Sequence, residues 1–228
     1  MNNKTALLIG ASGLVGNLCL EDLVASNLYN EIIVVSRRKL FPAHLGVTNI
    51  ISDFSNLDEI AFQIKADHVY CTLGTTIAKA GSQTAFKKVD YEYPLKVATL
   101  SKQNGAQKFI LVSAIGANAN SSVFYSKVKG KLEEAIEKLD FESCVILQPS
   151  FLLGKRSEVR IGELIGKKIA SAFAFAFVGG LEQYKGIEAS DVAKAMIVFA
   201  NKRDEKLIKA KYGDMIKAAN EFGKWHSA

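Results

Sequence analysis

The sequence predicts an α/β protein that forms a single domain, with a doubly wound parallel β-sheet and helices on both of its faces. Two observations predict this fold. Short, almost uncharged apolar runs alternate six times with longer segments of helical periodicity, and a glycine-rich turn directly follows the first run. Near-continuous apolar runs are typical of parallel strands covered on both faces, and their alternation with helices is the pattern of a doubly wound, Rossmann-type sheet.

Each expected element follows from one of these two patterns. The apolar runs predict strands at Thr5–Ile9, Ile32–Val35, Val47–Ile51, His68–Thr72, Phe109–Val112 and Cys144–Leu147. The segments of helical period predict helices at Leu14–Ser26, Leu57–Lys65, Pro94–Asn104, Phe124–Leu139 and Ser190–Phe199. About residues 1–155 would form the sheet core, and about 156–228 a smaller, mostly helical segment that caps the substrate cleft. A chain of 228 residues requires no second independent domain.

The charge and cysteine content exclude several classes of protein. The net charge is +6, but basic and acidic residues are interleaved, so we expect no nucleic-acid surface. The three cysteines are scattered and odd in number, and the three histidines are isolated, so we expect neither disulfides nor a metal site. The first residues run straight into a strand, and the longest uncharged apolar stretch, Ile169–Leu181, is short for a membrane span. These features predict a cytoplasmic protein.

The glycine-rich turn is the first candidate site. Gly10 allows a sharp turn, Gly13 allows backbone to approach a pyrophosphate, and Gly16 allows the helix to pack closely on the strand. The helix N-terminus adds unpaired N–H groups and the positive end of a dipole. A purely structural turn is the alternative, but the position between strand and helix favours a dinucleotide site. Its expected residues are Gly10, Ser12, Gly13, Leu14, Val15 and Gly16.

The residues after the second expected strand indicate which dinucleotide is bound. NAD binders usually carry an acidic residue there, which accepts hydrogen bonds from the ribose. This chain has Arg37 and Arg38 instead, and guanidinium groups bind a phosphate with two hydrogen bonds. We therefore expect NADP(H) to be preferred over NAD(H); a solvated basic loop is the alternative. Asp53 and Phe54, after the third strand, are candidates to border the adenine, although Asp53 is equally consistent with an ordinary strand end.

A tyrosine and a lysine provide a candidate for acid/base chemistry. Tyr125 and Lys129 are four residues apart, so a helix places both side chains on one face. A neighbouring ammonium favours the phenolate form, which makes Tyr125 a usable acid/base. Ser113 ends the fifth strand, where it could polarise a substrate carbonyl, and Lys129 could also hold the nicotinamide ribose. The alternative is a surface helix with an ordinary Tyr/Lys pair.

Taken together, the motifs make the chain resemble a short-chain dehydrogenase/reductase of the atypical or extended type, most similar to the Tat-interacting-protein-like oxidoreductases. The resemblance covers most of the chain. It rests on GASGLVG (10–16), SRR (36–38), CTLGTT (71–76), KVDYEYPLKVA (88–98), KFILVSAIGA (108–117), FYSKVKGKLE (124–133) and IEASDVA (187–193).

This resemblance implies an NADP-binding domain with a catalytic site at Ser113, Tyr125 and Lys129. It also implies that Tyr125, Lys129, Leu73, Gly74, Thr75, Pro149, Ser150, Phe151 and Leu152 line the cofactor. In one respect the chain departs from the family. Many catalytic members have an asparagine in the central helix that supports the lysine through water, and the nearest residue here is Asp90.

The leading hypothesis is an NADP(H)-dependent oxidoreductase that acts on a small carbonyl or hydroxyl substrate. The alternatives are a non-catalytic, NADPH-sensing regulator with a protein partner, and a nucleotide-sugar epimerase or dehydratase. The expected oligomeric state is a monomer or a homodimer. The segments Ala119–Phe124 and Ile169–Leu181 are expected to border the substrate. Phe173, Phe175 and Phe177 are consistent with core packing, an apolar substrate wall or a subunit contact.

Overall fold

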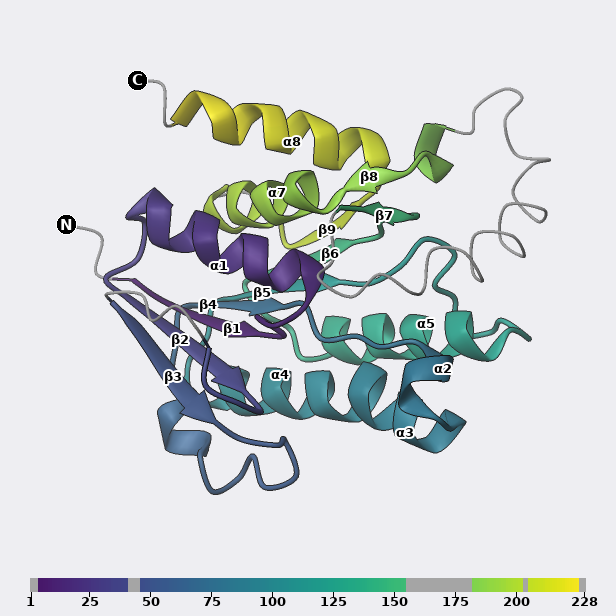
Figure 1. The fold of residues 1–228 in the computed structure, drawn as a ribbon, viewed down its shortest axis with the longest axis horizontal. Helices are drawn as coiled ribbons and strands as arrows, with labels where there is room; N and C mark the ends of the chain where they lie inside the picture. Colours follow the sequence, from purple (N-terminus) through teal and green to yellow (C-terminus); the bar gives the residue numbers. More distant parts are fainter. Residues whose placement is uncertain (1–3, 41–45, 155–181, 203–204, 226–228) are drawn as a thin grey trace.

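The structure, a computed structural model, describes residues 4–40, 46–154, 182–202 and 205–225. Its centre is a seven-stranded sheet of parallel neighbours in the order β3-β2-β1-β4-β5-β6-β9 (Figure 1). The strands are β1 (Thr5–Ile9), β2 (Glu31–Ser36), β3 (Val47–Ile51), β4 (His68–Cys71), β5 (Lys108–Val112), β6 (Ser143–Leu147) and β9 (Leu207–Ala210). A second, small sheet pairs β7 (Leu152–Leu153) with β8 (Ile187–Glu188). The predicted Rossmann-type fold is confirmed.

The order of the strands determines where the candidate site lies on the sheet. The chain runs outward from β1 through β2 to β3 and then returns to β4 on the other side of β1. Where the order reverses in this way, the loops after the two central strands diverge and leave a crevice at the carboxyl ends of the strands. The glycine turn follows β1 and the Leu73–Thr75 loop follows β4, so both flank that crevice.

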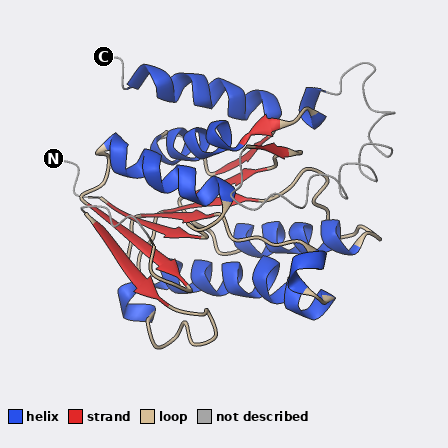
Figure 2. Ribbon diagram, viewed as in Figure 1, coloured by secondary structure: helices blue, strands red, loops and turns tan. Residues whose placement is uncertain are grey.

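Helices cover both faces of the sheet (Figures 1 and 2). One face carries α1 (Leu14–Ser26) and α7 (Ala189–Asn201), with α8 (Tyr212–Trp225) packed on α7; the other carries α4 (Tyr93–Gln103) and α5 (Phe124–Glu137). Side chains alternate along each strand, so Leu8 faces the α1 and α7 side while Leu7 and Ile9 face α4 and α5. This alternation explains why the strands are apolar throughout.

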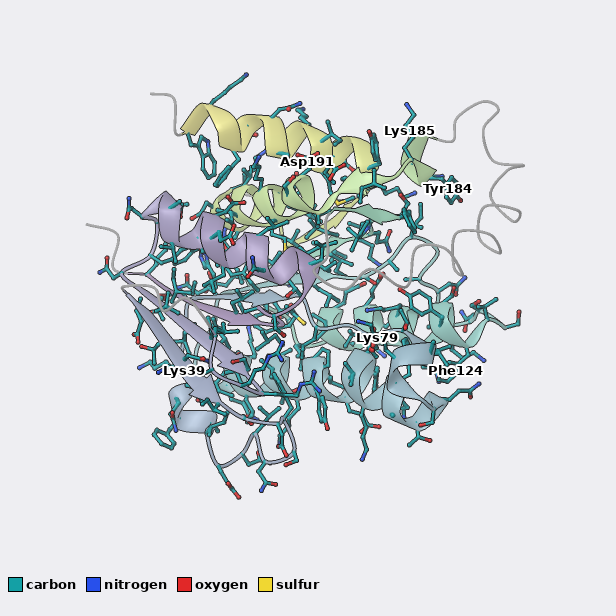
Figure 3. All side chains as sticks on the ribbon, in the orientation of Figure 1. Lys39, Lys79, Phe124, Tyr184, Lys185 and Asp191 are labelled. Carbon is teal, nitrogen blue, oxygen red and sulfur yellow. The ribbon has the colours of Figure 1, made fainter. Side chains whose placement is uncertain are left out.

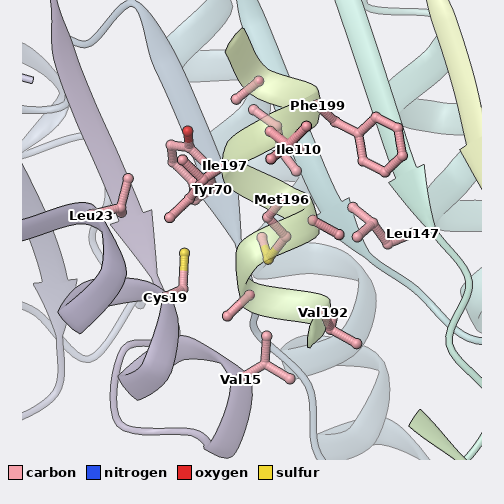
Figure 4. Packing of buried hydrophobic residues seen from close by; sticks show 14 of the residues in the cluster. Val15, Cys19, Leu23, Tyr70, Ile110, Leu147, Val192, Met196, Ile197 and Phe199 are labelled. Atoms are coloured by element: carbon pink, nitrogen blue, oxygen red, sulfur yellow. The ribbon is translucent and has the colours of Figure 1, made fainter. Parts of the chain in front are cut away.

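The core between the sheet and α7 is shown in Figure 4. Val192 and Met196 of α7 pack beside Val15 and Cys19 of α1 and over strand residues such as Ile110. All five side chains are buried. Burying this apolar stripe fixes the start of α1, and hence the glycine turn, against the sheet.

The predicted helix Leu57–Lys65 is wrong. The structure has only a three-residue 3₁₀ turn there, Ala61–Gln63. The side chain of Asn104, just beyond α4, donates hydrogen bonds to the carbonyl oxygens of Ala61 and Ile64, at 2.6 and 3.0 Å. Because these bonds satisfy backbone groups that a helix would otherwise use, the segment is held as a turn under α4.

The predicted helix at Pro94 is confirmed as α4, but it continues earlier helical structure. It follows α2 (Ile77–Ala80), α3 (Gln83–Lys87) and a π-helical turn, η2 (Lys88–Glu92). The helices at Leu14, Phe124 and Ser190 are confirmed as α1, α5 and α7. Strand β9 was not predicted. Phe173, Phe175 and Phe177, and the whole segment Ile169–Leu181, lie outside the described residues.

Candidate active site

The glycine turn has the geometry that a phosphate-binding turn needs. Gly10 has φ +88°, a conformation that side chains rarely adopt, and its carbonyl accepts a hydrogen bond from the Gly13 N–H at 2.9 Å. A Cβ atom at Gly16 would overlap the Gly10 carbonyl, so only glycine lets α1 approach β1 this closely. Gly13 precedes α1, and no side chain caps the helix.

The start of α1 can therefore bind an anion through its backbone. Ser12 and Gly13 are exposed, whereas Val15 is buried in the core, so Val15 can contribute only its N–H group. Leu14 is half-buried beside it. No side chain accepts a hydrogen bond from the N–H groups at the start of α1. These N–H groups and the positive end of the helix dipole therefore favour a phosphate at this position.

The loop after β2 is held by Asn49 of β3. The Asn49 amide donates to Ser36 Oγ at 2.8 Å and accepts from the Leu40 N–H at 3.0 Å, while Ser36 Oγ donates to the Arg38 carbonyl at 2.8 Å. Arg37 and Arg38 are both exposed. The backbone of the loop is thus fixed at the carboxyl end of β2 while both guanidinium groups remain accessible to a ligand.

Asp53 and Phe54, the two candidate residues after β3, have different surroundings. The Asp53 carboxylate is exposed and accepts hydrogen bonds from the Ser55 hydroxyl and N–H, which hold the pKa of this carboxyl below its usual value. Phe54 has φ +69° and its buried ring stacks on Tyr93, with 5.6 Å between centroids. The Phe54 ring therefore packs in the core against Tyr93, and its expected contact with an adenine stays a prediction.

Tyr125 and Lys129 lie one turn apart on α5, and Asp90 contacts Lys129. The Lys129 ammonium is buried and its Nζ lies 2.8 Å from Oδ1 of Asp90, which is itself fully buried on η2. The other carboxylate oxygen of Asp90 accepts a hydrogen bond from the Thr75 N–H at 2.8 Å. Tyr125 is half-buried, and its ring lies 5.6 Å from that of Phe86. Asp90 therefore contacts Lys129 directly.

Burial and charge act in opposite directions on Lys129. Burial, the largest single influence, lowers the pKa of the ammonium, but the adjacent Asp90 carboxylate and the other groups around it together raise that pKa above its ordinary value. Tyr125 and Cys71 act in the same direction as Asp90. Lys129 is thus held as a cation inside the protein.

Ser113 is not brought to Tyr125. Its hydroxyl donates a 2.5 Å hydrogen bond to Oε1 of Glu133, a buried carboxylate that also accepts from the Gln148 amide. Glu133 lies eight residues after Tyr125, which is about 12 Å along a helix. Glu133 therefore holds the Ser113 hydroxyl about two turns along α5 from Tyr125, and the catalytic role expected for Ser113 stays a prediction.

Glu133 was missed in the sequence, although a signal was present. Tyr125, Lys129 and Glu133 follow one another at intervals of four and share one face of α5. Burial raises the pKa of the Glu133 carboxyl, while its hydrogen bonds with Ser113 and Gln148 act in the opposite direction. A carboxylate on the buried face of a helix requires such polar partners.

The segment after β6 lies at the same edge of the sheet. The Pro149 carbonyl accepts from the Ile115 N–H at 2.9 Å, which joins the ends of β6 and β5, and the Ser150 hydroxyl donates to the Lys185 carbonyl. Phe151 is exposed, and Leu152 begins β7. Figure 3 shows Phe124, at the start of α5, and Lys185 at this same end of the molecule. Each expected site segment thus reaches the carboxyl edge of the sheet.

The fold and the site define a class, the dinucleotide-binding Rossmann proteins of the short-chain dehydrogenase/reductase type. Comparison with known proteins agrees. A family model described as NAD(P)H-binding matches residues 10–202. The chain belongs to this NAD(P)H-binding family, as an atypical, extended-type member similar to HTATIP2.

Two curated relatives illustrate the similarity. Protein HTATIP2 of Rattus norvegicus is 36% identical over 184 residues, which cover 79% of this chain and 76% of the relative. Protein FMP52, mitochondrial, of Candida albicans is 36% identical over 229 residues, which cover 95% and 98%. The predicted cytoplasmic location is wrong on this evidence, because several such relatives are named as mitochondrial. Across the described residues, no helix has the length and apolar character of a membrane span.

Solved structures share the fold at low sequence identity. A UDP-N-acetylglucosamine 4-epimerase from Methanobrevibacter ruminantium superposes with a TM-score of 0.70 at 19% identity, covering 93% of this chain and 78% of the epimerase. MoeE5, solved with UDP-glucose and NAD, gives a TM-score of 0.69 at 14% identity, covering 96% and 82%. These similarities show the fold and not the substrate.

Proposed function

We propose that the protein is an NADP(H)-dependent oxidoreductase that transfers hydride to or from a small carbonyl or hydroxyl substrate. The observation that carries the proposal is that Tyr125 and Lys129 lie one turn apart on α5, where Asp90 connects Lys129 to the Gly74–Thr75 loop. When bound, the nicotinamide cofactor supplies or accepts the hydride. The chain supplies binding, orientation and a proton.

The binding residues fit a dinucleotide. The free N–H groups at the start of α1 suit the pyrophosphate, and the exposed Arg37 and Arg38 suit a 2′-phosphate at the end of β2. Lys129 has three N–H donors, and its ion pair with Asp90 leaves donors for a ribose hydroxyl. We expect Pro149, Ser150, Phe151 and Leu152 to enclose the nicotinamide end.

Tyr125 is the residue we assign to proton transfer. In the direction of reduction its hydroxyl would donate a proton to the substrate oxygen, and in oxidation the same oxygen would accept it. Lys129 would orient the cofactor through its remaining N–H donors. Ser113 has no direct part in this scheme, because its hydroxyl is bound to Glu133.

The experiment that tests the proposal is a screen of aldehydes and ketones for NADPH oxidation by the wild-type protein and by Tyr125→Phe. We expect wild-type turnover that the variant lowers by about 100-fold or more, with NADPH affinity unchanged, because only the proton donor is lost. Tyr91→Phe, a change in a tyrosine outside the assigned residues, serves as the matched control. Turnover that persists in Tyr125→Phe would disprove the assignment.

A second candidate is an NADPH-binding regulator without turnover. The engagement of Ser113 by Glu133 favours it, since this hydrogen bond removes the serine hydroxyl from the substrate side. In that case NADPH would bind with the same contacts, but no compound in the screen would be reduced. The same assay, combined with a binding titration, therefore separates the two candidates.

A further inference from the structure

Asp90 contacts both halves of the candidate site. It lies on η2, the π-helical turn between α3 and α4, and its side chain is fully buried. We propose that Asp90 is a positioning residue that joins Lys129 to the Gly74–Thr75 loop, so that the acid/base helix and the cofactor loop form one preassembled unit. The contacts alone support this role; its consequence for turnover rests on the proposed function.

The two oxygens of the carboxylate have separate partners. Oδ1 lies 2.8 Å from Nζ of Lys129 on α5, and Oδ2 accepts from the Thr75 N–H at 2.8 Å in the loop after β4. Three elements distant in sequence thus meet on one side chain. Since hydrogen bonds to a charged acceptor are short and comparatively strong, this connection should limit the movement of the loop relative to α5.

The local backbone is suited to this role. A π-turn places an additional residue within a helix and is found often at functional sites, and here it carries Asp90. The Gly74–Thr75 loop also passes close to the ion pair between Asp90 and Lys129. A Cβ atom at Gly74 would lie 3.4 Å from Oδ1 of Asp90 and 3.6 Å from Nζ of Lys129, so the loop backbone covers the ion pair.

The carboxylate of Asp90, 2.8 Å from Nζ, favours the protonated form of Lys129, whereas burial opposes it. The titratable groups that act on the ammonium are Asp90 from η2, Tyr125 from α5 and Cys71 from β4. Cys71 is itself buried, with its pKa raised to about 12 by that burial, so it carries no charge near neutrality. If the Asp90 charge is removed, burial becomes the dominant influence and favours the neutral amine.

Two substitutions separate the two contacts. Asp90→Asn keeps an oxygen that can accept from the Thr75 N–H but removes the charge, whereas Asp90→Ala removes both. Asp58→Asn is a matched control, because Asp58 forms an exposed ion pair of 2.6 Å with Lys96 outside the site. Two measurements are made on the ligand-free protein: the pH titration of Lys129 by carbon-13 NMR of its Cε, and amide hydrogen exchange at Thr75.

The proposal predicts different outcomes for the variants. The Lys129 titration moves to lower pH in both Asp90 variants, while exchange at Thr75 becomes about 10-fold faster in Asp90→Ala and changes little in Asp90→Asn. Asp58→Asn leaves both unchanged. If Asp90→Ala does not fold, Asp90→Asn still tests the charge. The proposal is overturned if Lys129 in Asp90→Asn titrates as in the wild type, or if Thr75 exchange is the same in Asp90→Ala.

The consequence for the cofactor is measured by titration with NADPH. We expect Asp90→Ala to bind NADPH about 10-fold more weakly than the wild type, because the loop is no longer fixed. Equal affinity would overturn the role in preassembly. If the wild-type protein itself bound no NADPH, the proposed function would fail, whereas the NMR and exchange measurements would still decide the role of Asp90.

Discussion

The hydroxyl of Ser113 donates a 2.5 Å hydrogen bond to Oε1 of Glu133, which connects the end of β5 to the middle of α5. Gln148, just after β6, donates to both oxygens of the same carboxylate at 3.1 and 2.9 Å. Glu133 thus ties two strand ends to the helix that carries Tyr125 and Lys129. We infer from this arrangement a positioning role for Ser113; the catalytic role that the sequence suggested stays a prediction.

The first prediction concerns this connection. Glu133→Ala should lower the free energy of unfolding by about 1–3 kcal/mol, because the buried Ser113 hydroxyl and the half-buried Gln148 amide lose their acceptor. Urea denaturation measures the change. Glu134→Ala, an exposed neighbour on the same helix, should change stability by less than about 0.5 kcal/mol. Equal effects of the two substitutions would contradict the role given to Glu133.

Ser113→Ala provides a separate test on activity. We expect turnover to fall by less than about 3-fold, because the hydroxyl does not reach the substrate, while the unfolding free energy falls by about 1 kcal/mol. Steady-state kinetics on any substrate found in the carbonyl screen will show the difference from Tyr125→Phe. A loss of turnover as large as that in Tyr125→Phe would show that Ser113 takes part in catalysis.

The third prediction concerns cofactor preference. Replacing Arg37 and Arg38 together by alanine should weaken NADPH binding by about 10- to 100-fold and leave NADH affinity nearly unchanged, because only NADPH carries the 2′-phosphate. Calorimetric titration with both cofactors measures this. Lys65→Ala, which removes a cation from another part of the surface, controls for the change in net charge. If the double variant keeps its preference for NADPH, the arginines do not select the cofactor.

The fourth prediction concerns stability in mild acid. Burial, with the charges of Lys4 and Lys108, lowers the pKa of His68 to about 3. The unfolded chain binds this proton near pH 6.5, so stability is complete above that value and is lost as the pH falls toward 3. Between pH 7 and pH 5 the wild type should lose about 2 kcal/mol more than His68→Gln, as measured by urea denaturation at each pH. Parallel losses in both proteins would show that His68 is not the group responsible.

Much of the fold follows from sequence pattern alone. The six predicted strands and four of the five predicted helices are confirmed, because their apolar residues recur with clear periods, and the glycine turn lies between β1 and α1 as its spacing indicates. Strand β9 was missed, since Lys206-Leu207-Ile208-Lys209 is short, flanked by charges and lies at the sheet edge, where only one neighbour is needed. The segment after β3 was predicted as a helix because Asn104, which holds it as a turn, is 40 residues away from Ile64 in the sequence.

The candidate site was predicted in part. Tyr125 and Lys129 share a helix face, so their spacing was sufficient to pair them. The direct contact of Asp90 with Lys129 depends on a π-turn, and the engagement of Ser113 depends on Glu133 two turns along α5. A π-turn has no local sequence signal, and the spacing of Tyr125, Lys129 and Glu133 indicates a shared helix face without indicating that Ser113 is the partner of Glu133, which is why both contacts required the structure.

A crystal structure of the protein with NADP⁺ would test the proposed site directly. We expect the pyrophosphate on the N–H groups at the start of α1, the 2′-phosphate against Arg37 or Arg38, and the nicotinamide ring within reach of the Tyr125 hydroxyl. A dinucleotide bound away from the Gly10–Gly16 turn, or a nicotinamide directed away from Tyr125, would contradict it.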